Sequence, residues 1–125
     1  MKKLLAVLIV ILSLGTVSAF AQMSLAAPNP TDAKLLAKTE KDYATSKANF
    51  LRHASPKSKQ AYIIATVRFG TTSMVAATLP PRVKYRQALR LYREALKLDP
   101  GNHEAKTNSD LIVSIYKSMN RPVPN

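Results

Sequence analysis

A run of evenly spaced cations is the feature of this sequence best suited to binding chemistry. The cations lie three or four residues apart: Arg82, Arg86, Arg90, Arg93 and Lys97. On a helix, this spacing places all five side chains in one stripe. Guanidinium groups bind phosphate and carboxylate groups through paired N–H donors. The basic stripe, as these five residues are called below, is therefore a candidate docking strip for an anionic ligand.

The same stripe also has an ordinary structural interpretation. A surface helix presents charged side chains to water opposite its apolar face, and Glu94 lies four residues after Arg90, where it can neutralise part of the charge. Against this interpretation stands the surrounding composition, because no Asp or Glu occurs from Tyr43 to Arg93. Both interpretations stay open at this point.

Other residue types offer no pattern that is typical of catalysis or cofactor binding. His53 and His103 lie beside predicted helix boundaries and lack the converging ligands that a metal site needs. Cysteine is absent, which excludes disulfides and thiolate metal sites. The three glycines are scattered and form no phosphate-binding loop. We therefore predict a protein that is not an enzyme, with no catalytic residues, no cofactor and no metal.

The charge balance indicates which partners are suitable. The chain of 125 residues has a formal net charge of +12, which favours an acidic protein, an anionic polymer or a membrane surface. Nucleic acid is not a predicted ligand, because the sequence shows no aromatic stacking platform, zinc site or known DNA-reading motif.

The first 21 residues have the order of a cleavable signal peptide. Lys2 and Lys3 precede an apolar run from Leu4 to Leu14, and small residues follow up to Ala21. We expect cleavage after Ala21 and an exported protein, periplasmic or secreted. The alternative is a signal that is retained as a membrane anchor. Residues 22–30 contain alanine and proline without periodicity and are predicted to be a flexible lead.

Apolar periodicity in residues 31–120 predicts helices and no strands. The expected helical ranges are 32–53, 56 to at most 79, 82–98 and 103–119. Ser55 and Pro56 are suited to the N-cap and first position of the second helix. Gly70 and the β-branched residues after it predict a kink or break in that helix. Residues 121–125 are predicted to be a frayed tail.

Small and aromatic residues recur through the third predicted helix and the turn after it. They are Tyr85, Ala88, Tyr92, Ala95 and Pro100, with Ala76 at the corresponding small position in the helix before. This pattern resembles the 34-residue tetratricopeptide repeat. The resemblance covers roughly residues 69–119. It departs from the family at Leu79, where an aromatic is expected, and at Asp110, where the family has Gly or Ala.

The resemblance implies an all-α fold of antiparallel helical hairpins, a short right-handed solenoid of about four helices. Tetratricopeptide-like modules are scaffolds that bind other proteins. The expected function is therefore a non-enzymatic protein–protein interaction module of the cell envelope, with an acidic protein or a second copy of the chain as candidate partners. One alternative is a basic envelope-surface protein that binds anionic polymer or lipid headgroups through the basic stripe. Another is a membrane-tethered accessory subunit whose signal is never removed.

Overall fold

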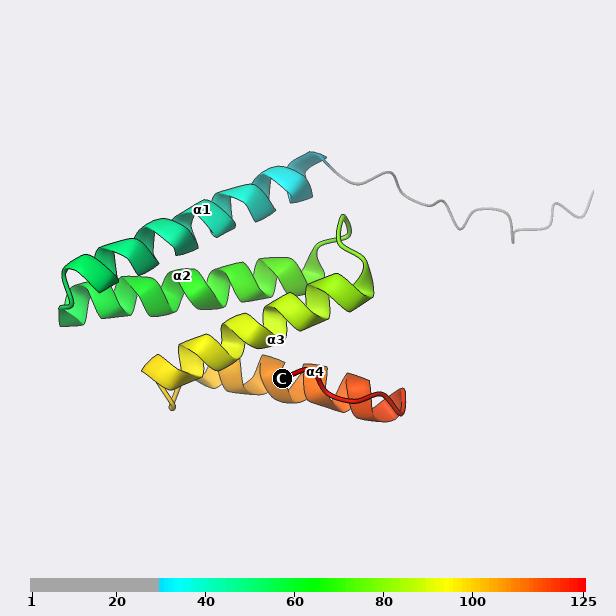
Figure 1. Ribbon diagram of the computed structural model, residues 1–125. Helices are drawn as coiled ribbons and strands as arrows, with labels where there is room; N and C mark the ends of the chain where they lie inside the picture. The colour runs from blue at the N-terminus through cyan, green and yellow to red at the C-terminus, as the bar shows by residue number, and fades with distance from the viewer. Residues whose placement is uncertain (1–29) are drawn as a thin grey trace, which may run out of the picture.

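The computed structural model describes residues 30–125, which form four α-helices. They are α1 (Pro30–Arg52), α2 (Pro56–Val75), α3 (Pro81–Leu98) and α4 (His103–Ser118). Each helix lies antiparallel beside the next one in sequence (Figure 1). The described residues thus confirm the predicted all-α class and the arrangement in antiparallel hairpins. The predicted signal peptide and residues 22–29 of the predicted lead lie outside the described residues.

Local sequence signals set two of the helix boundaries. Ser55 is the N-cap of α2, with its side chain accepting from the backbone N–H of Ser58 at 3.1 Å. The Ser58 hydroxyl accepts in return from the Ser55 backbone N–H at 2.9 Å, which completes a capping box. Asn102 caps α4 in the same way, because its side-chain oxygen accepts from the Ala105 N–H at 3.0 Å. These caps satisfy backbone donors that a helix start leaves unpaired.

The apolar face of α3 forms the centre of the core between α2 and α4. The buried core cluster consists of Ile63, Val67, Ala88, Leu89, Tyr92, Ala95, Ala105, Ile112 and Tyr116. Of the positions that resemble the repeat, Ala76, Ala88, Tyr92 and Ala95 are buried, Tyr85 is half-buried, and Pro100 is exposed in the turn after α3. Any packed helical hairpin buries such residues, so assignment to the repeat family stays a prediction.

The kink or break predicted near Gly70 is wrong, because α2 is continuous to Val75 and its ribbon runs straight (Figure 1). Packing outweighs the poor helix propensity here. A Cβ on Gly70 would lie 3.0 Å from Cε1 of Tyr92 and 3.4 Å from Cβ of Leu91, so the missing side chain lets α3 approach α2 closely. The Ser73 hydroxyl also donates to the Phe69 carbonyl, four residues back, at 2.7 Å, so this buried donor is hydrogen-bonded within the helix.

The frayed tail predicted for residues 121–125 is also wrong, because the chain turns back at the end of α4. Asn120 adopts a left-handed φ of 51°. The backbone N–H of Asn120 donates to the Lys117 carbonyl, and that of Arg121 donates to the Tyr116 carbonyl, each at 3.0 Å. This pair of bonds is a Schellman motif, which ends a helix and reverses the chain.

The reversed C-terminal segment, residues 121–125, then runs back along the helices, crossing in front of α4 in Figure 1. Val123 packs against the core cluster. The carbonyl of Pro124 accepts a hydrogen bond from Nη1 of Arg93 at 2.6 Å. The segment therefore forms one wall of the domain. In residues 30–125, no helix is long and apolar enough to cross a membrane.

Candidate functional site

The structure divides the basic stripe into engaged and free cations. Arg90 donates to Oε2 of Glu94 at 3.2 Å, and Arg93 is held by the Pro124 carbonyl. Arg82, Arg86 and Lys97 are exposed, and none of them forms a side-chain hydrogen bond or ion pair within residues 30–125. The stripe is therefore not a continuous row of free charges. The ordinary interpretation holds for Arg90, whose charge Glu94 partly neutralises as the sequence predicted.

The two free arginines at the start of α3 border a groove of about 880 Å³. The groove lies between the start of α3, the end of α4 and the C-terminal segment. Arg121 joins Arg82 and Arg86 on its wall, and no Asp or Glu lines it. Below, "the groove" means this feature with its three arginines.

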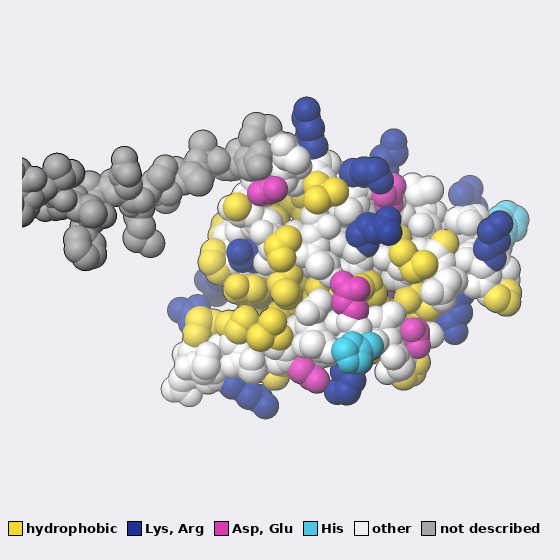
Figure 2. Space-filling model, turned by 180° about the vertical axis from the view of Figure 1, so that it is seen from behind, with side chains coloured by type: hydrophobic (Ala, Val, Ile, Leu, Met, Phe, Trp, Pro, Cys, Tyr) yellow, Lys and Arg dark blue, Asp and Glu magenta, His cyan; other side chains and the backbone are white. Residues whose placement is uncertain are grey.

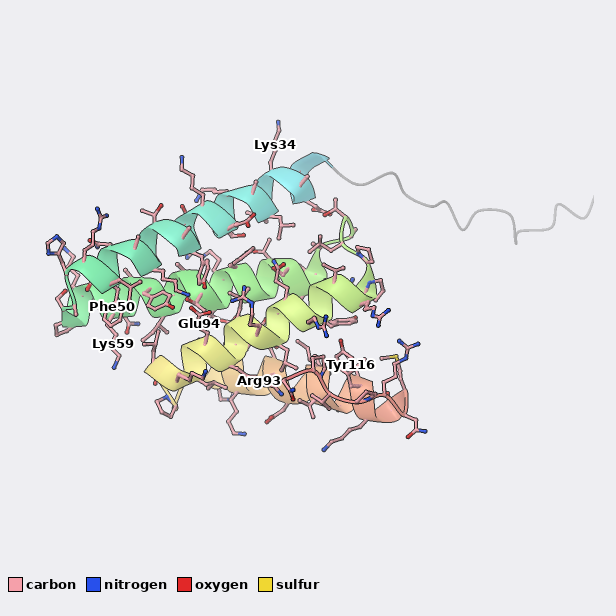
Figure 3. All side chains as sticks on the ribbon, viewed as in Figure 1. Lys34, Phe50, Lys59, Arg93, Glu94 and Tyr116 are labelled. Atoms are coloured by element: carbon pink, nitrogen blue, oxygen red, sulfur yellow. The ribbon has the colours of Figure 1, made fainter. Side chains whose placement is uncertain are left out.

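Most of the other lining residues of the groove are apolar or aromatic. They include Tyr85 from α3, Tyr116 and Met119 from the end of α4, and Val123 from the C-terminal segment. Figure 3 shows Tyr116 in the space between α3 and α4. Tyr116 and Tyr85 belong to or pack against the core, while Met119 is 50% exposed. The groove thus combines cations with apolar side chains, and Tyr85, Tyr116, Met119 and Val123 are called its apolar floor below.

The charged side chains that line the groove are all basic, unlike those of two other parts of the surface. Seen from behind, the molecule carries basic and acidic side chains interspersed with one another (Figure 2). A smaller hollow of about 410 Å³ between α2 and α4 likewise contains both signs, with Arg68 and Glu104 among its lining residues. Because like charges gather only at the cost of mutual repulsion, three arginines without an acidic neighbour favour an anionic ligand.

A second polar feature lies away from the groove and joins three helices. Glu94 of α3 accepts from the hydroxyls of Tyr43 of α1 and Tyr62 of α2, from Nζ of Lys47 at 2.9 Å, and from Arg90. Tyr43 contacts both carboxylate oxygens, at 2.9 and 3.0 Å. We call these five residues the Glu94 cluster; Figure 3 shows Glu94 facing the neighbouring helices.

The electrostatics of the Glu94 cluster indicate a structural role, in which the ionised carboxylate links three helices. Burial raises the pKa of Glu94, but hydrogen bonds from Tyr62, Lys47 and Tyr43 outweigh it and hold the pKa below its usual value. Burial and the bond to Glu94 raise the pKa of Tyr62 to about 12. Hydrogen bonds with Tyr43 and Glu94 raise the pKa of Lys47. Both carboxylate oxygens already have donors, so the cluster offers little to an incoming ligand.

The described residues contain no group of three or more His, Asp or Glu side chains placed to hold a metal ion. His53 and His103 are both exposed, near the end of α1 and at the start of α4. The structure does not bring these two helix boundaries together into a site.

The sequence predicted Arg82 and Arg86 as ligand contacts and Tyr85 only as a packing position, and it did not indicate the other residues of the groove. Arg121 and Met119 lie 33 to 39 residues beyond Arg82 and Arg86, and only the α3–α4 hairpin and the Schellman turn bring them together. The available signal was the Asn at position 120, a residue that tolerates the left-handed conformation after a helix. Comparison of the chain with protein-family models, with curated proteins and with solved structures finds no match in any of the three.

Proposed function

We propose that this protein is a non-enzymatic interaction module that binds an acidic protein partner at the groove. The observation that carries the proposal is the gathering of Arg82, Arg86 and Arg121 around an apolar lining without any Asp or Glu. Protein interfaces commonly centre on aromatic residues, methionine and arginine. The groove offers these side-chain types in one place.

The division of the basic stripe favours this function over the binding of an anionic polymer. A polyelectrolyte gains affinity from each free cation that it meets along a surface. Arg90 and Arg93 interrupt the row, because one is paired with Glu94 and the other is bonded to Pro124. A polymer also gains nothing from an apolar floor.

A membrane surface fits the described residues less well than a protein. Helices that lie in a membrane interface present one wide apolar face. The exposed large apolar side chains are instead spread over all four helices and the start of the C-terminal turn: Leu35, Leu51, Ile64, Val75, Val83, Leu111 and Met119. The signal peptide predicted at residues 1–21 supports the cell envelope as the compartment in which the partner is met.

The test is affinity capture with the full chain, tagged through a long flexible linker. Wild type is compared with Arg82→Glu/Arg86→Glu and with Lys57→Glu/Lys59→Glu, which has the same net charge. The control lysines are exposed at the start of α2, about 30 Å along the helix from its other end. We expect one protein to be retained by wild type and by the control variant through a high-salt wash, and to be lost from the groove variant. Equal retention by all three proteins would refute the proposal.

A further inference from the structure

The lining of the groove indicates what kind of acidic segment it takes. Resting on the proposed function, we infer that the groove recognises a segment in which an apolar side chain lies between carboxylates. The apolar side chain occupies the floor formed by Tyr85, Tyr116, Met119 and Val123, and the carboxylates pair with the surrounding arginines. The specificity is thus for a mixed acidic and apolar sequence, not for acidity alone.

The lining of the groove contains cations and apolar side chains. The cations come from two elements, since Arg82 and Arg86 belong to α3 and Arg121 belongs to the C-terminal segment. The same two elements also contribute apolar side chains, Tyr85 and Val123 among them, which gain from excluding water. A ligand seated in the groove therefore meets positive charge and apolar surface together.

Three of the four floor residues, Tyr85, Tyr116 and Val123, are held in place before any ligand binds. Tyr116 is buried and belongs to the core cluster, while Tyr85 and Val123 pack against it. The C-terminal segment is fixed by the Schellman motif at Asn120 and by the bond from Arg93 to Pro124. A preformed apolar floor costs little ordering on binding, so it can select among ligands by shape.

Carboxylate is the anionic group to which we commit. Arg82, Arg86 and Arg121 have no side-chain partner in the described part of the chain, and arginine binds carboxylates through two parallel N–H donors. An acidic protein segment supplies several carboxylates and an apolar side chain on one strand of backbone. Pure polyanions lack the apolar part.

The test measures the affinity of the full chain for defined probes by fluorescence anisotropy. The probes are an array of capped peptides in which one Leu or Phe is flanked by Glu at varied spacing, a polyglutamate peptide of equal charge, and phosphatidylglycerol vesicles. We expect the best mixed peptide to bind at least about tenfold more tightly than polyglutamate. Polyglutamate binding equal to every mixed peptide, or binding of the vesicles alone, would overturn the inference.

Paired variants locate the binding to the floor. Met119→Ser removes a half-exposed side chain from the groove, and Leu111→Ser removes one of similar exposure (47%) from α4 outside it. We expect Met119→Ser to weaken the best peptide about tenfold and Leu111→Ser to change it less than twofold. Equal effects would overturn the inference. If the captured partner depends on Arg82 and Arg86 but not on Met119, the proposed function survives and only the apolar selectivity fails.

Discussion

Replacing Glu94 by Gln tests whether the Glu94 cluster holds α1 onto the rest of the domain. In residues 30–125, the backbone of α1 lies close to that of α2 but not to that of α3. The bonds from Tyr43 and Lys47 to Glu94 therefore form a direct polar link between α1 and α3. Gln keeps the volume of Glu94 but removes its charge and replaces one accepting oxygen by a donor.

The magnitude follows from the number and exposure of these bonds. A hydrogen bond to a charged group contributes about 1.5–3 kcal/mol. The Glu94 side chain is only 19% exposed, whereas Lys47 is 40% exposed and Arg90 is 54% exposed, so solvent weakens the two ion pairs. Because the Gln carbonyl still accepts from some donors, we expect the free energy of unfolding to fall by about 2–3 kcal/mol. For a domain of this size, that lowers Tm by about 10–20 °C.

The assay is urea and thermal unfolding followed by circular dichroism. The control is Asp110→Asn, which removes an exposed i,i+4 pair with Lys106 and should change stability by less than about 0.5 kcal/mol. If Glu94→Gln destabilises the domain no more than Asp110→Asn does, the reasoning about the cluster is refuted.

Four further predictions concern stability. Because the pKa of Glu94 is lowered in the folded state, ionised Glu94 stabilises the fold above about pH 4.5, and this stabilisation is lost on acidification. In unfolding measured from pH 7 to pH 3, the free energy of unfolding of Glu94→Gln should therefore fall less than that of wild type. At the alkaline end, folding raises the pKa of Tyr62 to about 12, so stability should fall between about pH 10 and pH 12. Tyr62→Phe should reduce that fall without abolishing it, because the pKa values of Lys47 and Tyr92 are raised as well. Gly70→Leu should cost at least about 2 kcal/mol in urea unfolding because the side chain would collide with Tyr92; an unchanged midpoint would contradict the close approach of α3. Asn120→Ala should cost about 1 kcal/mol at its left-handed φ while Asn120→Gly should not, and equal stability of the two variants would argue against the Schellman turn.

Local signals in the sequence were sufficient to predict the four helices and most of their ends. Ser55-Pro56 predicted the start of α2, and the Asp99–Asn102 turn predicted the break between α3 and α4, because caps and turns depend on neighbouring residues. The prediction failed at Gly70, where contact with Tyr92 from another helix outweighed helix propensity. Propensity is a weak prior when tertiary packing opposes it.

The sites depended on contacts between distant positions, and these were harder to predict. The spacing of Arg90 and Glu94 indicated one ion pair, but the partners of Glu94 on α1 and α2 lie 32 to 51 residues away. The groove required the reversal at Asn120, which returns residues 121–125 to α3. The sequence predicted the basic stripe as one row of cations. In the described residues, Arg90 and Arg93 are bonded to Glu94 and Pro124, whereas the other three cations are free.

The most direct test of the central claim is the affinity of the captured partner for groove and control variants at low and high salt. We expect Arg82→Glu/Arg86→Glu to weaken binding at least about 30-fold at both salt concentrations, because direct contacts are lost. Lys57→Glu/Lys59→Glu should change it by less than about threefold, since distant charges act mainly through screened long-range attraction. If both variants weaken binding equally, and the loss disappears at high salt, the partner responds to net charge alone and the groove is not its site.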